Sequence, residues 1–128
     1  MRYLVDTHVL IWWWDRSERL PKRVLDVLQG REHEVYISAV TGWEIAMKVR
    51  SGKLPSMNDR VHRYVADVVQ DGFVHMPVAP DHGVTAGLLD GSHKDPFDRL
   101  IAAQAIAEDL TVITRDPEIA RFGCKVFW

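Results

Sequence analysis

The sequence predicts an α/β fold in three layers, with a central, mainly parallel sheet between two layers of helices. Apolar runs such as Tyr3–Val5 and Leu110–Thr114 show no polar alternation, which is typical of strands buried on both faces. Segments with helical periodicity follow the apolar runs, so strands and helices alternate along the chain. The length of 128 residues suits one domain with a substantial core, and we expect residues 1–128 to form it.

The first strand and the first helix are joined without a spacer. Tyr3–Val5 is followed at once by Asp6 and Thr7, either of which would cap a helix over His8–Trp14. Successive helical residues point about 100° apart, so the tryptophans at positions 12–14 cannot all face one core. At least one of these rings is expected at the surface, where it would suit a dimer or partner interface.

The remaining elements continue the alternation. Helices are predicted where apolar residues recur at helical spacing behind a proline or a polar cap, over residues 21–29, 39–50, 59–71, 81–88, 96–107 and 117–122. Strands are predicted where short runs are rich in β-branched or aromatic residues, over residues 35–37, 73–76, 110–114 and 125–128.

Composition narrows the function classes. The formal net charge of −2 gives no global basic field, so a nucleic-acid partner would need a local basic patch or bound cations. The single cysteine, Cys124, cannot form an internal disulfide, which suits a reducing cytoplasm. Asp6 interrupts the first apolar stretch, so no secretory signal is expected, and no apolar run approaches the ~20 residues of a membrane helix. We expect a cytoplasmic protein that does not associate with membranes.

Four acids occupy positions that a parallel sheet would bring to one edge. Asp6 and Asp116 follow predicted strands, whereas Glu44 and Asp98 lie near the starts of predicted helices. Crowded carboxylates repel each other, and a hard divalent cation relieves that repulsion. The chemistry usual for such a site is phosphodiester hydrolysis, in which the metal generates a hydroxide and stabilises the charged oxygens.

Each acid also has a structural explanation. Asp6 and Asp116 are suitable helix caps, and Asp98 would complete a capping box that begins at Asp95. Glu44 could pair with Lys48 one turn later, a surface ion pair worth roughly 0.3–0.5 kcal/mol. Capping alone does not require four acids to converge, and this coincidence favours a functional site.

Four segments carry a resemblance to a known family, in the order Leu4–Leu10, Trp43–Lys48, Asp95–Ala105 and Ile113–Asp116. The chain resembles the PIN domain, and within that family the VapC toxins of prokaryotic toxin–antitoxin pairs. The resemblance covers essentially the whole length. It implies a PIN-like fold, Mg²⁺- or Mn²⁺-dependent cleavage of single-stranded RNA, and a small antitoxin that blocks the site. A homodimer is also expected.

The resemblance maps the acidic site onto Asp6, Glu44, Asp98 and Asp116. Asp6 and Asp98 are the first choice as direct metal ligands, and Asp116 would bind directly or through water. Glu44 would hold metal-bound water or orient the nucleophile. Thr114 matches the small hydroxyl residue often found near the last acid.

Three further residues are candidates for supporting roles. Asp95 competes with Asp98 for the third acidic position, and the family pattern favours Asp98 with Asp95 as cap or outer acid. Arg99 and Arg115 flank site acids, where they would contact RNA phosphates or steady the carboxylates. The six histidines include no pair with zinc-motif spacing, and solvated or core roles are expected for His8 and His93, which lie nearest the site.

Two other classes of protein compete with a nuclease. A phosphoacceptor signalling domain also gathers acids around Mg²⁺, but it needs an acceptor Asp after a middle strand, where this chain has Ser38. A catalytically inert binding module of the same fold is the second alternative, although a decayed site would be expected to have lost some of its acids.

Overall fold

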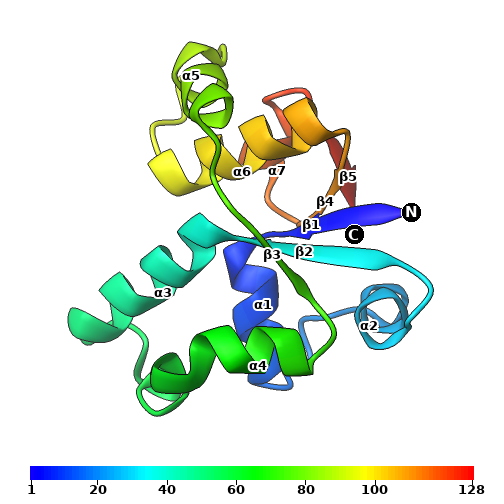
Figure 1. Cartoon of the computed structure of the whole chain (residues 1–128), viewed down its shortest axis with the longest axis vertical. Coiled ribbons are helices and arrows are strands. Elements are labelled where there is room, and N and C mark those ends of the chain that lie inside the picture. The colour runs from blue at the N-terminus through cyan, green and yellow to red at the C-terminus, as the bar shows by residue number, and fades with distance from the viewer.

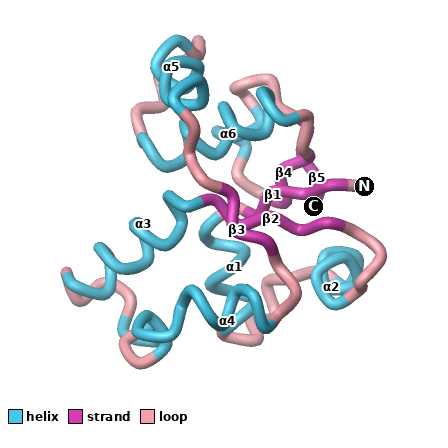
Figure 2. Tube along the Cα trace, viewed as in Figure 1, coloured by secondary structure: helices cyan, strands magenta, loops and turns pink.

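A five-stranded sheet forms the centre of the computed structural model, which describes all 128 residues of the chain. The strands are β1 (Arg2–Val5), β2 (Glu34–Ser38), β3 (Val74–Met76), β4 (Thr111–Ile113) and β5 (Lys125–Phe127). The α-helices are α1 (Thr7–Trp14), α2 (Lys22–Gln29), α3 (Ala39–Arg50), α4 (Tyr64–Gln70), α5 (Pro80–Leu88), α6 (Pro96–Glu108) and α7 (Pro117–Ala120). Strands and helices are distinguished in Figure 2.

All five strands are parallel, in the order β3-β2-β1-β4-β5. The first strand lies in the middle, where Leu4 is paired with Tyr36 of β2 and Val112 of β4. Every strand therefore ends at the same edge of the sheet. Helices α1 and α3 begin directly after β1 and β2 at this edge, as Figure 1 shows.

Helices cover both faces of the sheet, which confirms the predicted three-layer α/β/α architecture. In Figure 1, α1, α2 and α4 lie on one side of the sheet, and α5, α6 and α7 lie on the other. Side chains alternate along β1, so that Tyr3 and Val5 belong to the core beneath α1 and α2, whereas Leu4 packs with Ile101 and Ala105 of α6. The central strand is buried on both faces for this reason.

The structure differs from the sequence prediction between residues 55 and 71. The expected continuous helix over 59–71 is divided into a 3₁₀ turn at Arg60–Arg63 and the α-helix α4. Arg63 leaves the helical region, with φ −122° and ψ 21°, and this interrupts the hydrogen-bond ladder. A short 3₁₀ turn at Pro55–Met57, which the sequence pattern did not predict, buries Met57.

The three tryptophans of α1 all pack against one core cluster, so the expectation that they cannot all face one core is wrong, although each ring is only half-buried. The indole N–H groups of Trp13 and Trp14 both donate to Oδ2 of Asp71, at 2.9 and 2.8 Å. These two rings therefore attach α1 to the loop after α4. None of the helices combines the length and the apolarity that a membrane crossing requires.

The first prediction concerns the close packing of α6 on the sheet. Replacing the fully buried Ala102 by Leu adds volume to a filled core, and it should lower the free energy of unfolding by roughly 1–3 kcal/mol. Ala107 is exposed on the same helix, so Ala107→Leu is a matched control that should be near neutral. Urea denaturation measures both; equal stability of the two variants would contradict the packing.

Candidate active site

The structure brings the four acids together at the carboxyl edge of the sheet. Asp6 follows β1, Asp116 lies after β4, and Glu44 and Asp98 project from α3 and α6. The acids lie near enough to repel one another: Asp6 and Asp116 raise the pKa of Asp98, and Glu44 raises that of Asp6. Two sheet-end positions and two helix starts thus form one acidic cluster.

Asp6 is buried at the end of the central strand, with 3% of its surface exposed. Its Oδ2 accepts a hydrogen bond from the Thr114 hydroxyl at 2.8 Å, whereas its Oδ1 is buried without a hydrogen-bond partner and has His8 Nδ1 4.0 Å away. Asp6 occupies the cap position of α1, but its side chain makes no capping bond. Burial raises the pKa of Asp6, and the bond from Thr114 partly offsets this. Capping therefore does not account for the carboxylate.

Asp116 is connected to Asp6 through Thr114. The Thr114 hydroxyl donates to Asp6 and accepts the backbone N–H of Asp116 at 3.0 Å, so this one side chain fixes the positions of both acids. One carboxylate oxygen of Asp116, Oδ1, accepts the N–H of Glu118 at 2.9 Å and caps α7. Asp116 therefore caps α7 through Oδ1, as expected, and its Oδ2 accepts no hydrogen bond.

Glu44 is buried to the same extent as Asp6, with 3% exposed. Its Oε2 accepts a hydrogen bond from Lys48 Nζ at 2.8 Å, which is the ion pair expected from their spacing. Its second oxygen, Oε1, is buried and has no partner. Because the carboxylate is buried, this pair is not the weak surface interaction that the spacing alone suggested. The hydroxyls of Thr7 and Thr41 lie 3.1 Å apart nearby and join α1 to α3.

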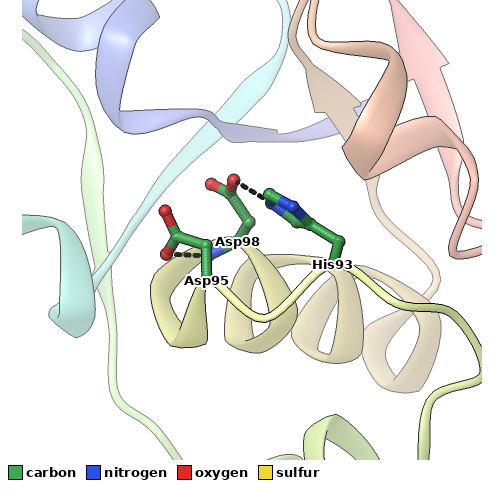
Figure 3. A group of neighbouring side chains, drawn as sticks. All are labelled: His93, Asp95 and Asp98. Atoms are coloured by element: carbon green, nitrogen blue, oxygen red, sulfur yellow. Dashed lines mark hydrogen bonds and ion pairs between the residues drawn. The ribbon is translucent and has the colours of Figure 1, made fainter.

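Asp95 and Asp98 divide their roles at the start of α6, as Figure 3 shows. Asp95 Oδ1 accepts the N–H groups of Phe97 and Asp98, at 2.9 and 3.3 Å, and therefore caps the helix. The Asp98 carboxylate makes no capping bond and instead accepts a hydrogen bond from His93 Nε2 at 2.8 Å. Burial raises the pKa of Asp98 to about 6, against the opposing effect of His93.

His93 belongs to the site, and the expectation that it is solvated or part of the core misses this contact. One ligand atom from each of His93, Asp95 and Asp98 lies within 4.8 Å of the others, in an arrangement that could hold a metal ion. The hydrogen bond to Asp98 raises the pKa of His93. The only sequence feature that pointed to His93 was its position just before the cap of α6, since it is not part of any metal-binding motif.

The two flanking arginines have defined partners in the structure. The Arg99 guanidinium donates to the carbonyls of Ala86, Leu89 and His93, at 2.9, 2.6 and 3.0 Å, and so holds the loop that carries His93. Arg115 lies against Trp12, with its Cζ 4.6 Å from the ring centroid. Neither guanidinium forms an ion pair with the four acids, so their connection to the site is indirect.

The donor set fits a hard divalent cation. Unpaired buried carboxylate oxygens are costly, and Asp6 Oδ1 and Glu44 Oε1 are two of them within one acidic cluster. Oxygen ligands from carboxylates are those that Mg²⁺ and Mn²⁺ prefer. Burial is the larger cause of the raised pKa values of Asp6 and Asp98, and repulsion between the acids adds to it; a bound dication would favour the ionised form of both.

Comparison with known proteins identifies the class. The PIN domain family model matches residues 3–124, and the chain belongs to the PIN domain family. Members of this family are typically nucleases that use divalent metal ions. No curated protein matches the chain.

Three solved structures share this fold. The chain is similar to VapBC2 from Rickettsia felis bound to a promoter DNA fragment, with a TM-score of 0.74, 19% identity, and 99% and 98% coverage of this chain and that chain. For FitAcB from Neisseria gonorrhoeae the TM-score is 0.68, the identity 23% and the coverage 98% and 96%. For VapBC-1 from nontypeable Haemophilus influenzae the values are 0.70, 15%, 99% and 97%.

The second prediction concerns the pH dependence of stability without metal. The pKa of Asp98 is about 6 in the fold and 3.8 ordinarily, so between these values the folded chain holds a proton that the unfolded chain releases. The contribution of Asp98 to stability therefore falls as the pH rises from about 4 to about 6. Asp98→Asn lacks this penalty and should gain roughly 2 kcal/mol over the wild type across that window, since water screens part of the full effect.

Urea denaturation at several pH values in the presence of a chelator measures the difference. Asp90→Asn, at an exposed loop position, is the control and should follow the wild type at every pH. Adding Mg²⁺ at pH 7 should stabilise the wild type more than Asp98→Asn, because the ion favours the ionised carboxylates. A difference between wild type and Asp98→Asn that does not vary with pH would contradict the assignment.

Proposed function

We propose that the chain is a metal-dependent endoribonuclease, the toxin of a toxin–antitoxin pair, and that residues 1–128 form its single nuclease domain. The observation that carries the proposal is the pair of buried, unpartnered carboxylate oxygens on Asp6 and Glu44 within one acidic cluster. A phosphoacceptor domain needs an acceptor Asp where β2 ends in Ser38, and membership of the PIN domain family counts further against that alternative.

In this proposal, Asp6 and Asp98 bind Mg²⁺ or Mn²⁺ directly, and Asp116 contributes its free oxygen directly or through water. Glu44 holds metal-bound water or orients the attacking nucleophile. When bound, the ion supplies an activated water and stabilises the charge on the phosphodiester oxygens.

The surrounding residues hold these acids in place. Thr114 donates to Oδ2 of Asp6 and so orients the carboxylate, whose Oδ1 has no hydrogen-bond partner. Lys48 likewise binds Oε2 of Glu44 and leaves Oε1 free. Asp95 caps α6 and so sets the direction of Asp98, which His93 contacts from the preceding loop. Preorganised acids of this kind need little rearrangement to receive the ion.

A partner protein is the second part of the proposal, and the similar structures of VapBC and FitAB assemblies support it. An apolar hollow of about 1060 Å³ lies between α3 and the segment leading into α4. Trp43, Val65 and Val69 line it and are 60–67% exposed, a large apolar surface for one chain. We assign the antitoxin to this hollow, because Trp43 in its lining packs edge to face on Phe97, with ring centroids 4.9 Å apart, so a segment bound there would lie near the start of α6, the helix that carries Asp98. A homodimer stays a prediction.

The third prediction tests the nuclease. Asp6→Asn preserves shape but removes the charge of the central acid, so RNA cleavage should fall by at least about a thousandfold while the fold is retained. Cleavage of a pool of single-stranded and structured RNAs in Mn²⁺ or chelator, followed by end mapping, measures this and identifies the target. Undiminished cleavage by Asp6→Asn would refute the assignment.

Metal titration separates the enzyme from an inert binding module. Calorimetry should show Mn²⁺ binding to the wild type and much weaker binding to Asp6→Asn. Asp81→Asn, at an exposed position on α5, is a control that should bind Mn²⁺ like the wild type. If the wild type binds neither Mg²⁺ nor Mn²⁺, the inert module is the better description.

The fourth prediction tests the antitoxin surface. Val69→Glu places a charge in the apolar hollow and should weaken binding of the proposed antitoxin by about tenfold or more. Val84 is exposed to a similar extent on α5, far from the hollow lining, so Val84→Glu is the matched control. Calorimetric affinities decide the matter, and equal affinity for the two variants would exclude the hollow as the binding surface.

A further inference from the structure

A second hollow lies beside the acidic cluster, between α1 and the carboxyl end of α3. Its volume is about 560 Å³, and its lining includes His8, Trp12, Asp15, Arg19, Lys48 and Lys53. Four of these side chains are basic or can become so, and only one is acidic. In a chain with a net charge of −2, this is a local concentration of positive charge.

Two residues connect this hollow to the acids. His8 Nδ1 lies 4.0 Å from Asp6 Oδ1, and Lys48 Nζ lies 2.8 Å from Glu44 Oε2. Both side chains also line the hollow. A molecule bound there would therefore be adjacent to the two carboxylates whose second oxygens are unpartnered.

Trp12 supplies an aromatic surface in the hollow. It lies one helical turn beyond His8, and the two ring centroids are 6.2 Å apart. Unlike Trp13 and Trp14, whose N–H groups are both bound to Asp71, Trp12 has no hydrogen-bond partner for its indole N–H, and that atom is not sealed from solvent. The Trp12 ring is half-buried and meets Trp128 edge to face, with centroids 6.0 Å apart, and its indole N–H remains a free donor.

Cations without carboxylate partners surround the Trp12 ring. The guanidinium carbons of Arg115 and Arg19 lie 4.6 and 5.8 Å from its centroid, and neither arginine forms an ion pair. Lys53, on the other wall, is exposed and also lacks an ion-pair partner. An aromatic ring with unpaired cations around it is the combination that binds a nucleobase and its phosphate in single-stranded nucleic acids.

We propose that this hollow is a nucleotide subsite, in which a base of single-stranded RNA stacks on Trp12 and the adjoining phosphates contact Arg19 and Lys53. The subsite holds a nucleotide next to the cleaved bond, because His8 and Lys48 connect it directly to Asp6 and Glu44. This inference rests on the proposed nuclease function and adds the place where the substrate strand is held. A partner protein is the competing occupant.

The test measures binding of a fluorescent single-stranded oligoribonucleotide, spanning the mapped cleavage point, by anisotropy in chelator. Trp12→Leu keeps apolar bulk but removes the stacking surface, and it should weaken binding about tenfold, whereas Trp12→Phe should retain most of the affinity. Lys53→Ala and Arg19→Ala should each reduce the slope of log affinity against log salt by about 0.7. Arg23→Ala removes an exposed charge from α2, outside the hollow lining, and should leave the slope unchanged.

An abasic substitution separates a stacking role from a structural one. In the wild type, removing one base beside the cleavage point should weaken binding about tenfold, and in Trp12→Leu the same removal should have little further effect. Equal losses in the two proteins would overturn the subsite, as would a Trp12→Leu variant that binds RNA normally but changes assembly or antitoxin affinity. If the wild type neither binds nor cleaves RNA, the nuclease proposal itself fails.

Discussion

The burial of negative charge at the carboxyl edge of the sheet is the constraint on which the other features of this site depend. Asp6 and Glu44 are each almost fully buried, and one oxygen of each has no hydrogen-bond partner. Burying a carboxylate oxygen without a hydrogen-bond partner costs folding free energy, and at Asp6 burial and a neighbouring carboxylate also raise the pKa. A fold selected for stability alone would have little reason to keep it, and a site for a divalent cation explains it.

The parallel topology makes this concentration of acids possible. Because every strand of a parallel sheet ends at the same edge, residues far apart in sequence are delivered to one place. Asp6 and Thr114 are 108 positions apart, yet they share a buried hydrogen bond because β1 and β4 are neighbours. The helices that begin at this edge add Glu44 and Asp98, and the Asp95 cap frees Asp98 from a capping role.

The two hollows on either side of α3 suggest a division of binding surfaces around the acids. The hollow toward α4 is mainly apolar, and Trp43 in its lining contacts Phe97 at the start of α6. The hollow toward α1 is basic and aromatic, and Lys48 brings it to the same glutamate. The chemistry of the two hollows suits different ligands. The phosphates of a nucleic acid need cations, whereas a protein segment needs apolar surface. In this scheme, α3 carries one acid of the site and a wall of each hollow.

Local sequence was sufficient for the layers, the parallel sheet and the caps at Asp95 and Asp116, and it singled out the four acids, because apolar periodicity, prolines and polar caps are determined by neighbouring residues. It also offered Asp6 as a cap, and the Asp6 side chain makes no capping bond. Local sequence did not predict the hydrogen bond between His93 and Asp98, the bonds from Arg99 to three carbonyls, or the helix break at Arg63. These features depend on loop paths and on contacts between distant segments. Nor could local sequence distinguish Trp12 from Trp13 and Trp14, because the difference lies in a distant residue. Asp71 accepts hydrogen bonds from Trp13 and Trp14 only. The sequence by itself determined which residue types reach the edge of the sheet; only the tertiary structure decided which of their atoms remain unpaired, since pairing depends on three-dimensional distance.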